Sequence, residues 1–404
     1  MIASLFWLSV TSIVYAYVGY PLILAILART RLDKQGDSGV TPFVTLLIAA
    51  YNEEATIAEK LENSLALDYP RHRLQILVAA DGSDDRTVDI VRSYAGRGVE
   101  LSYSGPRRGK MAAINRAMDQ VIGDVVLFSD ANNLYEPNAV REIVKPFADP
   151  QVGAVSGAKI IIQGDGALGE SEGLYWKYES FIKQQETRLG SCVGVAGEVL
   201  AVRHGLFEAP PNYIINDDFY VAMRVIQRDY RVVYTPQARS YERVSPSAQD
   251  EMDRRARIVA GRYQALALAY RLLPLRRPII AWQVISHKFL RPLVPLAMVG
   301  ALITNVIAVF DPAPPAVPSL SHLTPPFGWL LLLAQVVFYG LAWVGGHIAQ
   351  RSKLFYLPTF LLNSNLAAVM GLVRFLTRQQ TSLWQRVPRR RLQRPLPLHE
   401  EGEG

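Results

Sequence analysis

Long stretches without a charged residue limit what this chain can fold into more than any other feature. The first runs from Ile2 to Ala28, and three more lie late in the chain: Pro292–Phe310, Gly328–Gly346 and Leu354–Val373. A helix of about 20 consecutive apolar residues is long enough to cross the hydrocarbon core of a bilayer. The sequence therefore predicts an integral membrane protein.

The charges that flank the first stretch predict its orientation. Arg29, Arg31 and Lys34 follow it, and no basic residue precedes it. Positive residues favour the cytoplasmic side of a membrane, and a signal peptide would carry its basic residues in front. We therefore expect residues 1–30 to be an uncleaved anchor and the segment that follows to be cytoplasmic.

The charge of the chain is concentrated at its end. The formal net charge is +7, and residues 374–394 contain seven arginines and no acidic residue, so the remainder is balanced. This pattern, with half of the residues apolar, does not suit a nucleic-acid-binding protein. We expect no nucleic acid among the partners, and we expect membrane lipids among them.

The arginine-rich tail, residues 377–404, conflicts with a simple count of spans. An anchor that ends in the cytoplasm and three later spans would place this tail outside, whereas its charge favours the inside. The stretch Leu354–Val373 is therefore expected to be re-entrant or interfacial within a helical region of residues 292–376, unless the charge rule fails here. Residues 279–291 carry His287, Lys288 and Arg291, and we expect an interfacial helix.

Between the anchor and the late helices lies a block of mixed composition, residues 41–275. Short apolar runs at Phe43–Ala50, Leu74–Ala80 and Val125–Phe128 are typical of buried parallel strands. Helical patterns alternate with these runs, at 54–67, 84–94, 110–121 and 137–147. Alternating strands and helices predict an α/β fold with a mainly parallel sheet.

Polar clusters follow each of the three predicted strands. They are Tyr51-Asn52-Glu53, Asp81-Gly82-Ser83-Asp84 and Ser129-Asp130-Ala131-Asn132. Ligands of open α/β sheets bind beyond the carboxyl ends of the strands, where these clusters would meet. Each cluster alone could simply form a turn or cap a helix, whereas the three together favour a binding site.

The residue types in these clusters suggest an anion and a divalent cation. Asp130 and Asn132 offer hard oxygen ligands, which suit Mg²⁺ or Mn²⁺. Lys110 opens a predicted helix, where an ammonium and backbone N–H groups could face the same anion. The single cysteine, Cys192, excludes a disulfide framework and a cysteine-based zinc site.

Two further groups of charged residues lie downstream. Asp217 and Asp218 precede a helical pattern; they could supply a general base or could only cap that helix. Arg254 and Arg257 lie three residues apart on another predicted helix. They could clamp a phosphate, or they could belong to a solvated or headgroup-facing surface.

In this order the motifs resemble the family 2 (GT-A fold) membrane glycosyltransferases, which include the cellulose, chitin and hyaluronan synthases. The resemblance covers roughly residues 42–290 and implies a Rossmann-like GT-A domain with N-terminal and C-terminal transmembrane helices. The matching pieces are Ala50–Glu54, Ala80–Thr87, Gly109-Lys110 with Ala113 and Asn115, Ser129–Asn132, Gly197-Glu198 with Arg203, Asp217-Asp218 with Arg224, and Arg254-x-x-Arg257.

This resemblance implies a role for each residue. Tyr51, Glu53 and Asp81 would hold the nucleobase and ribose of a nucleotide sugar, most often a UDP-sugar. Lys110 and Arg254 would lie near its diphosphate, and Asp130 with Asn132 would bind the metal. Asp218, beside Asp217, would be the catalytic base of an inverting transfer, and Arg257 would neutralise the departing diphosphate.

The chain departs from the pattern of the polymerising synthases. Asn132 stands where their metal motif has a second aspartate, and Arg254-x-x-Arg257-Ile258 stands where they carry Gln-x-x-Arg-Trp. Transfer of a single sugar is therefore as compatible with the sequence as polymerisation.

Together these features predict an inverting glycosyltransferase of the hexosyltransferase type with its catalytic domain at the cytoplasmic membrane face. Its acceptor would be a lipid-linked sugar or a growing polysaccharide. The alternative is a membrane subunit that binds a nucleotide sugar or a glycan without catalysis.

Overall fold

The computed structural model describes residues 1–31, 39–162, 167–243, 248–311, 317–347 and 353–380. Its described residues divide into two units. The sheet unit comprises Leu27–Glu251 and Leu268–Ala281, and the helical unit comprises Met1–Ile26, Met252–Ala267 and Trp282–Gln380. Residues 252–267 were expected to be part of the 41–275 block, whereas in the structure they belong to the helical unit.

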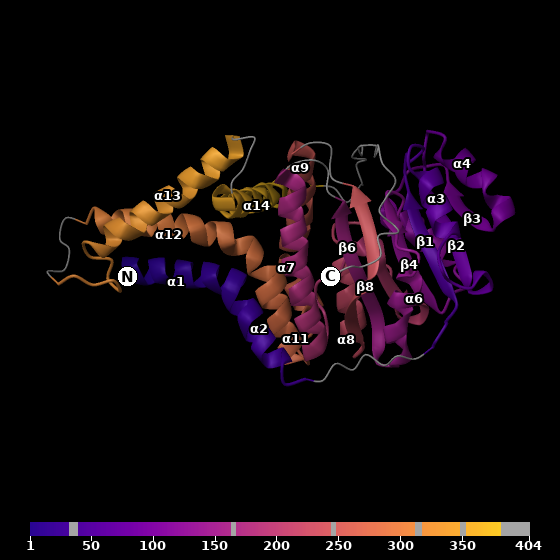
Figure 1. Ribbon diagram of the computed structural model, residues 1–404, viewed down its shortest axis with the longest axis horizontal. Helices are drawn as coiled ribbons and strands as arrows, with labels where there is room; N and C mark the ends of the chain where they lie inside the picture. Colours follow the sequence, from indigo (N-terminus) through magenta and orange to yellow (C-terminus); the bar gives the residue numbers. More distant parts are fainter. Residues whose placement is uncertain (32–38, 163–166, 244–247, 312–316, 348–352, 381–404) are drawn as a thin grey trace. The chain divides into compact units, whose positions relative to one another are not determined.

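The sheet unit is built on one mixed sheet with the strand order β3-β2-β1-β4-β7-β6-β8-β5 (Figure 1). The β3-β2-β1-β4 half is parallel throughout, and β6 also pairs in parallel with β8, whereas β7 and β5 are antiparallel to their neighbours. This arrangement confirms the mainly parallel α/β fold. The strands are β1 (Val44–Ala50), β2 (Leu74–Asp81), β3 (Val99–Ser104), β4 (Val125–Asp130), β5 (Asn133–Tyr135), β6 (Val152–Ile162), β7 (Leu200–Arg203) and β8 (Arg231–Arg243).

The sequence pattern explains why some strands are evident and another is not. Every residue of β1 and β2 is buried, so both strands form continuous apolar runs. Strand β3 pairs only with β2, at the edge of the sheet, and exposes Glu100 and Tyr103. Because one face of β3 is polar, its sequence resembles that of a loop, and the strand was not predicted from the sequence.

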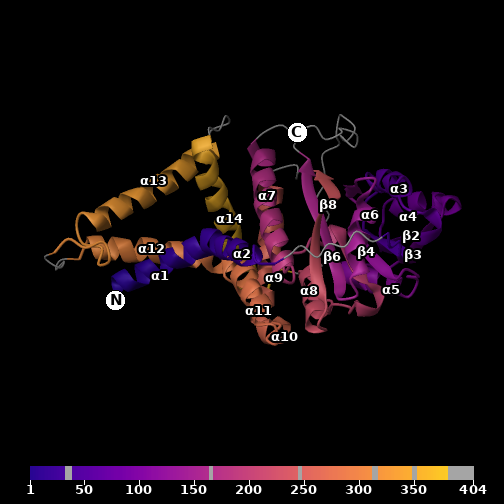
Figure 2. The same ribbon diagram turned by 60° about the horizontal axis from the view of Figure 1, so that its bottom comes forward.

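The sheet unit contains seven α-helices among its described residues. They are α3 (Ile57–Leu65), α4 (Thr87–Ser93), α5 (Lys110–Met118), α6 (Ala139–Val144), α7 (Ala167–Leu189), α8 (Asp217–Gln227) and α10 (Ala269–Leu272). Figure 2 shows α7 alongside β6 and β8 from a second direction. The four helices expected between residues 54 and 147 are confirmed, each shorter than its pattern suggested.

The strand directions bring the predicted polar clusters to one edge. Because β7 runs against both β4 and β6, strands β1, β2, β4, β6 and β8 all end on the same side. We call this side the carboxyl edge. Strand β7 begins there, so residues just before Leu200 also lie on it.

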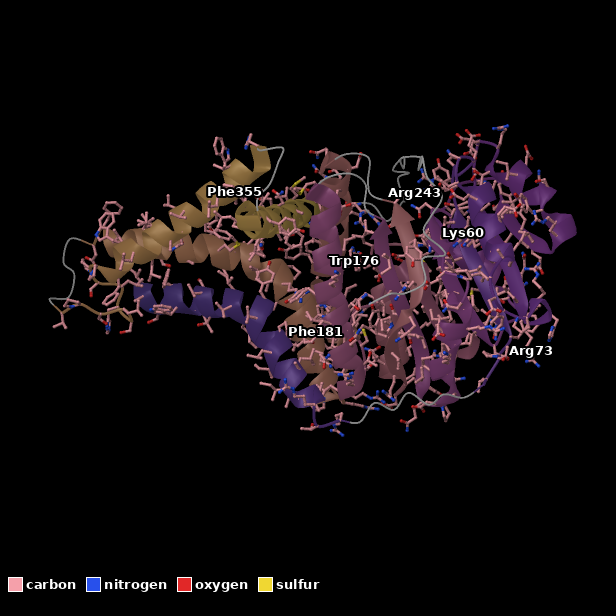
Figure 3. The ribbon with its side chains drawn as sticks, in the orientation of Figure 1. Lys60, Arg73, Trp176, Phe181, Arg243 and Phe355 are labelled. Carbon is pink, nitrogen blue, oxygen red and sulfur yellow. The ribbon has the colours of Figure 1, made fainter. Side chains whose placement is uncertain are left out.

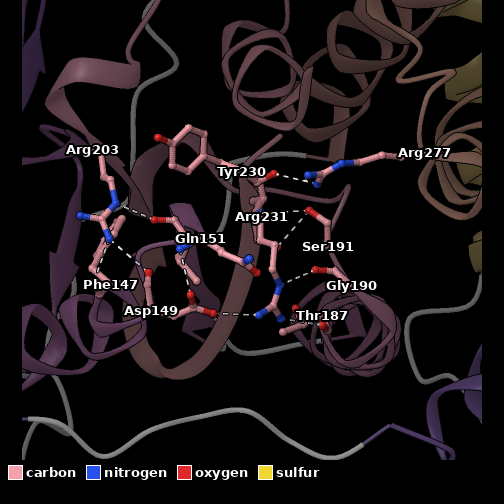
Figure 4. Close-up of polar contacts among 12 residues, drawn as sticks. Phe147, Asp149, Gln151, Thr187, Gly190, Ser191, Arg203, Tyr230, Arg231 and Arg277 are labelled. Atoms are coloured by element: carbon pink, nitrogen blue, oxygen red, sulfur yellow. Dashed lines mark hydrogen bonds and ion pairs between the residues drawn. The ribbon is translucent and has the colours of Figure 1, made fainter. Parts of the chain in front are cut away.

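The opposite edge is held by arginines that bind main-chain carbonyls (Figure 4). Arg203 donates to the carbonyls of Val152, at 2.7 Å, and Phe147, at 2.8 Å. Arg231 donates to the carbonyl of Gly190 and pairs with Asp149. These contacts join the ends of β7 and α7 to the starts of β6 and β8.

The helical unit contains most of the apolar segments. Among the described residues, four helical segments are long and apolar enough to cross a membrane: Ile2–Ala28, Pro278–Val309, Phe327–His347 and Leu354–Leu376. They are formed by α1 (Ile2–Val14) with α2 (Tyr20–Ala28), α11 (Pro278–Val284) with α12 (Val294–Val309), α13 (Phe327–His347) and α14 (Lys353–Leu376). Helix α1 lies beside α12, and α9 (Ala248–Ala267) completes this part of the chain.

Two of these segments differ from the sequence-based expectation. The expected interfacial helix over 279–291 and the span that follows form one helical segment, joined by a π turn at Ile285–Phe289 and a 3₁₀ turn at Arg291–Leu293. Helix α14 is continuous, so residues 354–373 do not turn back as a re-entrant segment would. Most of the predicted tail, residues 381–404, lies outside the described residues.

Polar side chains join the first two of these segments. The hydroxyl of Tyr15 bonds to the Ser286 hydroxyl at 2.8 Å, and the indole N–H of Trp282 donates to the Tyr15 oxygen at 2.8 Å. Such bonds between helices satisfy polar groups that lipid cannot.

Candidate active site

The loops after β1 and β2 are tied together at the carboxyl edge. The Asn52 side chain donates to Asp84 Oδ1 at 2.5 Å, and the Asp84 N–H returns a bond to Asn52 Oδ1 at 3.1 Å. Asn52 has a φ of 53°, a conformation that asparagine tolerates better than most residues. Two of the predicted polar clusters therefore form one connected surface.

Glu53, predicted to bind the nucleoside, lies within this surface. It is buried, its N–H donates to Thr87 Oγ1 at 2.7 Å, and its carboxylate accepts from Thr56 Oγ1 at 2.7 Å. Tyr51 lies beside it, with the guanidinium of Arg107 3.9 Å from the centre of its ring. Arg107 extends the predicted site, and no sequence signal set it apart from the neighbouring arginines.

Asp81 holds the loop that leads into α5. Its two carboxylate oxygens accept the N–H groups of Arg108 and Gly109, each at 2.8 Å. Gly82 permits this approach, because its φ is +61° and a Cβ there would lie 2.6 Å from the backbone nitrogen of Arg107. Asp81 thus positions the start of α5, and its contact with a nucleobase stays a prediction.

Lys110, the first residue of α5, pairs with Asp130 at the end of β4. The Lys110 ammonium lies 2.7 Å from Asp130 Oδ1. Burial lowers the pKa of Lys110, but the carboxylates of Asp130, Asp217 and Asp218 outweigh it and raise the pKa above its usual value. The predicted diphosphate, metal and base residues of the sheet unit therefore share one electrostatic environment.

Asp217 and Asp218 form the first turn of α8. The Asp218 Oδ1 accepts the N–H of Phe219 at 2.7 Å, as a residue at a helix N-terminus can. Gly197 lies against the other side of this carboxylate: a Cβ built on Gly197 would be 3.1 Å from the Asp218 Cβ. The helix start and this glycine together fix where the Asp218 carboxylate lies.

Few of the described side chains at this site could bind a metal ion. The described residues contain no group of three or more His, Cys, Asp or Glu side chains that could hold an ion by themselves. Asp130 supplies one carboxylate, with the half-buried Asn132 two residues away. Mg²⁺ commonly binds one or two carboxylates together with substrate phosphates, so these residues fit a cation shared with a diphosphate.

Lys60 is a charged residue that the sequence analysis missed. Lys60, labelled in Figure 3, is fully buried on α3, and its ammonium lies 4.1 Å from the ring centre of Tyr135. Burial lowers the pKa of Lys60 to about 7, although the negative charge of Asp130 acts to raise it. Its position in an amphipathic helix pattern gave no sign of this burial.

Three further arginines belong to the predicted or matched motifs. Arg254 and Arg257 lie on α9 in the helical unit, so their roles at the site stay predictions. Arg203 lies at the opposite edge of the sheet and binds backbone carbonyls, which is a structural role.

Comparison with known protein families matches a large part of the sheet unit. Residues 45–208 match the model of the glycosyl transferase family 2. The chain carries a family 2 glycosyltransferase domain. The matched residues include all of β1 except Val44, the Lys110–Asp130 pair and Glu198.

The related proteins include polysaccharide synthases. The poly-beta-1,6-N-acetyl-D-glucosamine synthase of Staphylococcus aureus is 28% identical over 252 residues, and the match covers 59% of this chain and 59% of that protein. The beta-monoglucosyldiacylglycerol synthase of Synechocystis is 28% identical over 207 residues, which cover 49% of this chain and 43% of that protein. The chain thus aligns with about three fifths or less of the length of these relatives.

A solved structure supports the fold over nearly the whole chain. The mannosyltransferase PcManGT from Pyrobaculum calidifontis, in complex with GDP-Man and Mn²⁺, superposes with a TM-score of 0.72. The superposition covers 94% of this chain and 100% of that one, at 23% identity. The fold is GT-A-like, as expected from the sequence.

Proposed function

We propose that this chain is an inverting glycosyltransferase that transfers a sugar from a nucleotide sugar, most often a UDP-sugar, to an acceptor at the membrane. One observation carries the proposal: the carboxyl edge brings the Lys110–Asp130 pair within electrostatic reach of Asp217 and Asp218. A cation and a carboxylate beside a possible base are the groups that this transfer needs.

The proposed reaction is a direct displacement. The acceptor oxygen forms a bond to the anomeric carbon of the sugar while the bond from that carbon to the diphosphate oxygen breaks. The Asp218 carboxylate takes the proton of the acceptor hydroxyl, and the nucleoside diphosphate leaves with the bonding electrons. We assign to the Lys110 ammonium the stabilisation of the charge on that diphosphate.

A divalent cation, Mg²⁺ or Mn²⁺, would neutralise part of the diphosphate charge when it is bound. Asp130 is the residue that would hold it, with Asn132 as a neutral neighbour. Removal of the cation with a chelator should weaken donor binding in the wild type and should have a smaller effect in Asp130→Ala. Equal chelator effects in both proteins would contradict the assignment of Asp130.

The candidate spans and the basic residues after the first span support a membrane enzyme whose sheet unit faces the cytoplasm. The relatives named as synthases support a lipid-linked or polysaccharide acceptor. Arg254 and Arg257 are proposed to contact the diphosphate from α9.

The test is release of nucleoside diphosphate by the detergent-purified protein, supplied with UDP-N-acetylglucosamine, UDP-glucose or GDP-mannose and Mg²⁺ or Mn²⁺. Asp218→Asn should abolish release and leave donor binding, measured by calorimetry, within about threefold. Asp89→Asn is the matched control, because Asp89 is an exposed carboxylate on α4.

Each result points to one function. Release that Asp218→Asn abolishes supports the transferase. Donor binding without any release, in the wild type and in the variant alike, would instead support the non-catalytic binding subunit. Failure to bind any donor would contradict the transferase and also a subunit that binds nucleotide sugars.

A further inference from the structure

A short segment of the sheet unit, residues 268–281, exposes several large apolar side chains. Tyr270, Leu275 and Ile279 are 73%, 72% and 45% exposed. The segment contains α10 and the first residues of α11. A single exposed apolar side chain is ordinary, whereas several within one short segment indicate a surface that binds a partner or a membrane.

The same segment is basic. It contains Arg271, Arg276 and Arg277 and no acidic residue. Arg277 pairs with Asp229 at 3.2 Å, so the charge of this arginine is offset. Arg271 and Arg276 are exposed, and each directly follows one of the exposed apolar side chains. Arginines beside exposed apolar groups are typical of segments that lie on an anionic membrane surface.

The first two candidate spans indicate the depth of this segment. They run antiparallel, because α1 lies beside α12 and Tyr20 of α2 packs against Trp282 of α11, with ring centres 5.1 Å apart. From that contact α2 continues to Ala28 and α11 reaches back to Pro278, about 12 Å and about 6 Å along the helices. In a bilayer that contains both spans, the residues just before Pro278 would therefore lie at the surface where α2 ends.

The segment is fixed to α8, whose first turn carries the proposed base. Gln227, the last residue of α8, donates from its side-chain amide to the carbonyl of Arg271 at 2.6 Å. Just beyond α8, the guanidinium of Arg277 donates to the carbonyl of Tyr230 at 3.2 Å (Figure 4). Helix α8 is about 16 Å long, and a rigid element of this length passes a displacement of one end to the other, where Asp218 lies.

We propose that residues 270–279 dock on a bilayer surface that contains anionic phospholipids. The guanidinium groups of Arg271 and Arg276 bind the lipid phosphates, and the exposed apolar side chains of the segment enter the headgroup region. The docked segment holds the end of α8 and thereby the position of the proposed base. The lipid contact is independent of the proposed glycosyltransferase function, and only its effect on transfer rests on that function.

The lipid contact is tested with a fluorophore on the full-length protein in nanodiscs. Leu275→Cys is labelled with the fluorophore NBD, since the native Cys192 is buried, and nitroxide-labelled phospholipids quench a probe that they contact. Ile122→Cys is the matched control, because Ile122 is 63% exposed and its N–H binds Gln75 of β2, on the other side of the sheet from β8. We expect the lipids to quench the probe at position 275 by about half or more and the probe at position 122 by less than about a tenth.

The effect on transfer is tested in nanodiscs of phosphatidylcholine alone and of phosphatidylcholine with about 30% phosphatidylglycerol. The kcat of nucleoside diphosphate release by the wild type should be about fivefold higher with the anionic lipid, and the donor KM should change by less than about twofold, because the lipid acts on the base through α8. The double variant Arg271→Gln/Arg276→Gln should lose this stimulation. Arg92→Gln/Arg141→Gln is the control, which removes two arginines from exposed ion pairs on α4 and α6 and should keep it.

The two measurements separate the lipid contact from the proposed function. Equal quenching at positions 275 and 122, or no quenching at position 275, would overturn the lipid contact. Equal kcat values in the two lipids, or stimulation that both double variants retain, would overturn its effect on the base. Quenching at position 275 without release from any donor in either lipid would reject the glycosyltransferase function and support the lipid contact.

Discussion

The ammonium of Lys110 lies 2.7 Å from a carboxylate oxygen of Asp130, and each side chain is 20% exposed. The sequence motifs suggest separate roles for these residues, one at the diphosphate and one at the metal. Their contact means that each side chain fixes the charge and position of the other. A pair that is mostly shielded from water is coupled more strongly than a surface pair.

This coupling predicts non-additive effects of substitution. Lys110→Met and Asp130→Asn should each lower kcat/KM for the donor by about 10- to 100-fold, since each removes a charge-assisted contact. The double variant should lose less than the product of the two, with a coupling energy of about 1–3 kcal/mol. Lys145→Met, which removes a helix surface pair with Glu142, is the control and should leave kcat/KM unchanged.

A second prediction concerns the close approach of Gly197 to Asp218. In Gly197→Ala the new methyl group would lie 3.1 Å from the Asp218 Cβ, tighter than ordinary contact, so the carboxylate must shift. Because small displacements of a catalytic group are costly, kcat should fall by about tenfold or more while the donor KM changes little. Gly205→Ala is the matched control, since a Cβ there meets nothing within 4 Å. Similar kcat values for the two variants would show that Gly197 does not set the position of Asp218.

An element of this fold could be predicted from the sequence where its own residues show a clear pattern of burial. Strands β1 and β2 are buried throughout, so their composition alone predicts them, and the α/β fold follows from their alternation with helices. The edge strand β3 carries a polar face, and local pattern cannot separate it from a loop.

The same limit applies to the candidate site. Strand ends indicate Asp81 and Asp130, because their position follows from sheet topology. The burial of Lys60 beneath Tyr135 and the position of Arg107 over Tyr51 depend on contacts between segments distant in sequence. Arg203 matches a family motif, yet its side chain binds the carbonyls of Phe147 and Val152 at the opposite edge, so a motif position alone does not imply a role at the site.

A third prediction follows from that position of Arg203 (Figure 4). Arg203→Met leaves the carbonyls of Phe147 and Val152 without their charged donor, which should cost about 2–4 kcal/mol. For a unit of this size the thermal midpoint should fall by about 5–10 °C. Arg228→Met removes an exposed arginine that pairs with Glu208 at 3.4 Å, and it should change the midpoint by no more than about 2 °C. A fall of equal size in both variants would reject the structural role of Arg203.

The last prediction concerns the pH dependence of stability that Lys60 causes. Its pKa is about 7 in the folded protein, lowered by burial from an ordinary value of 10.5. Between these values the unfolded chain binds a proton that the folded protein does not, so the contribution of this group makes stability rise with pH from about 7 to 10.5. Below about pH 7 the folded protein must bury the charged ammonium, and its cost is greatest there.

Lys60→Met removes that cost, so the variant should be more stable than the wild type by roughly 4–5 kcal/mol at pH 6 and by only about 1 kcal/mol at pH 10. Thermal midpoints of both proteins across this range measure the difference, with Lys145→Met as an exposed control whose offset from the wild type should not vary with pH. An offset for Lys60→Met that stays constant from pH 6 to 10 would show that Lys60 keeps its ordinary pKa in the folded protein.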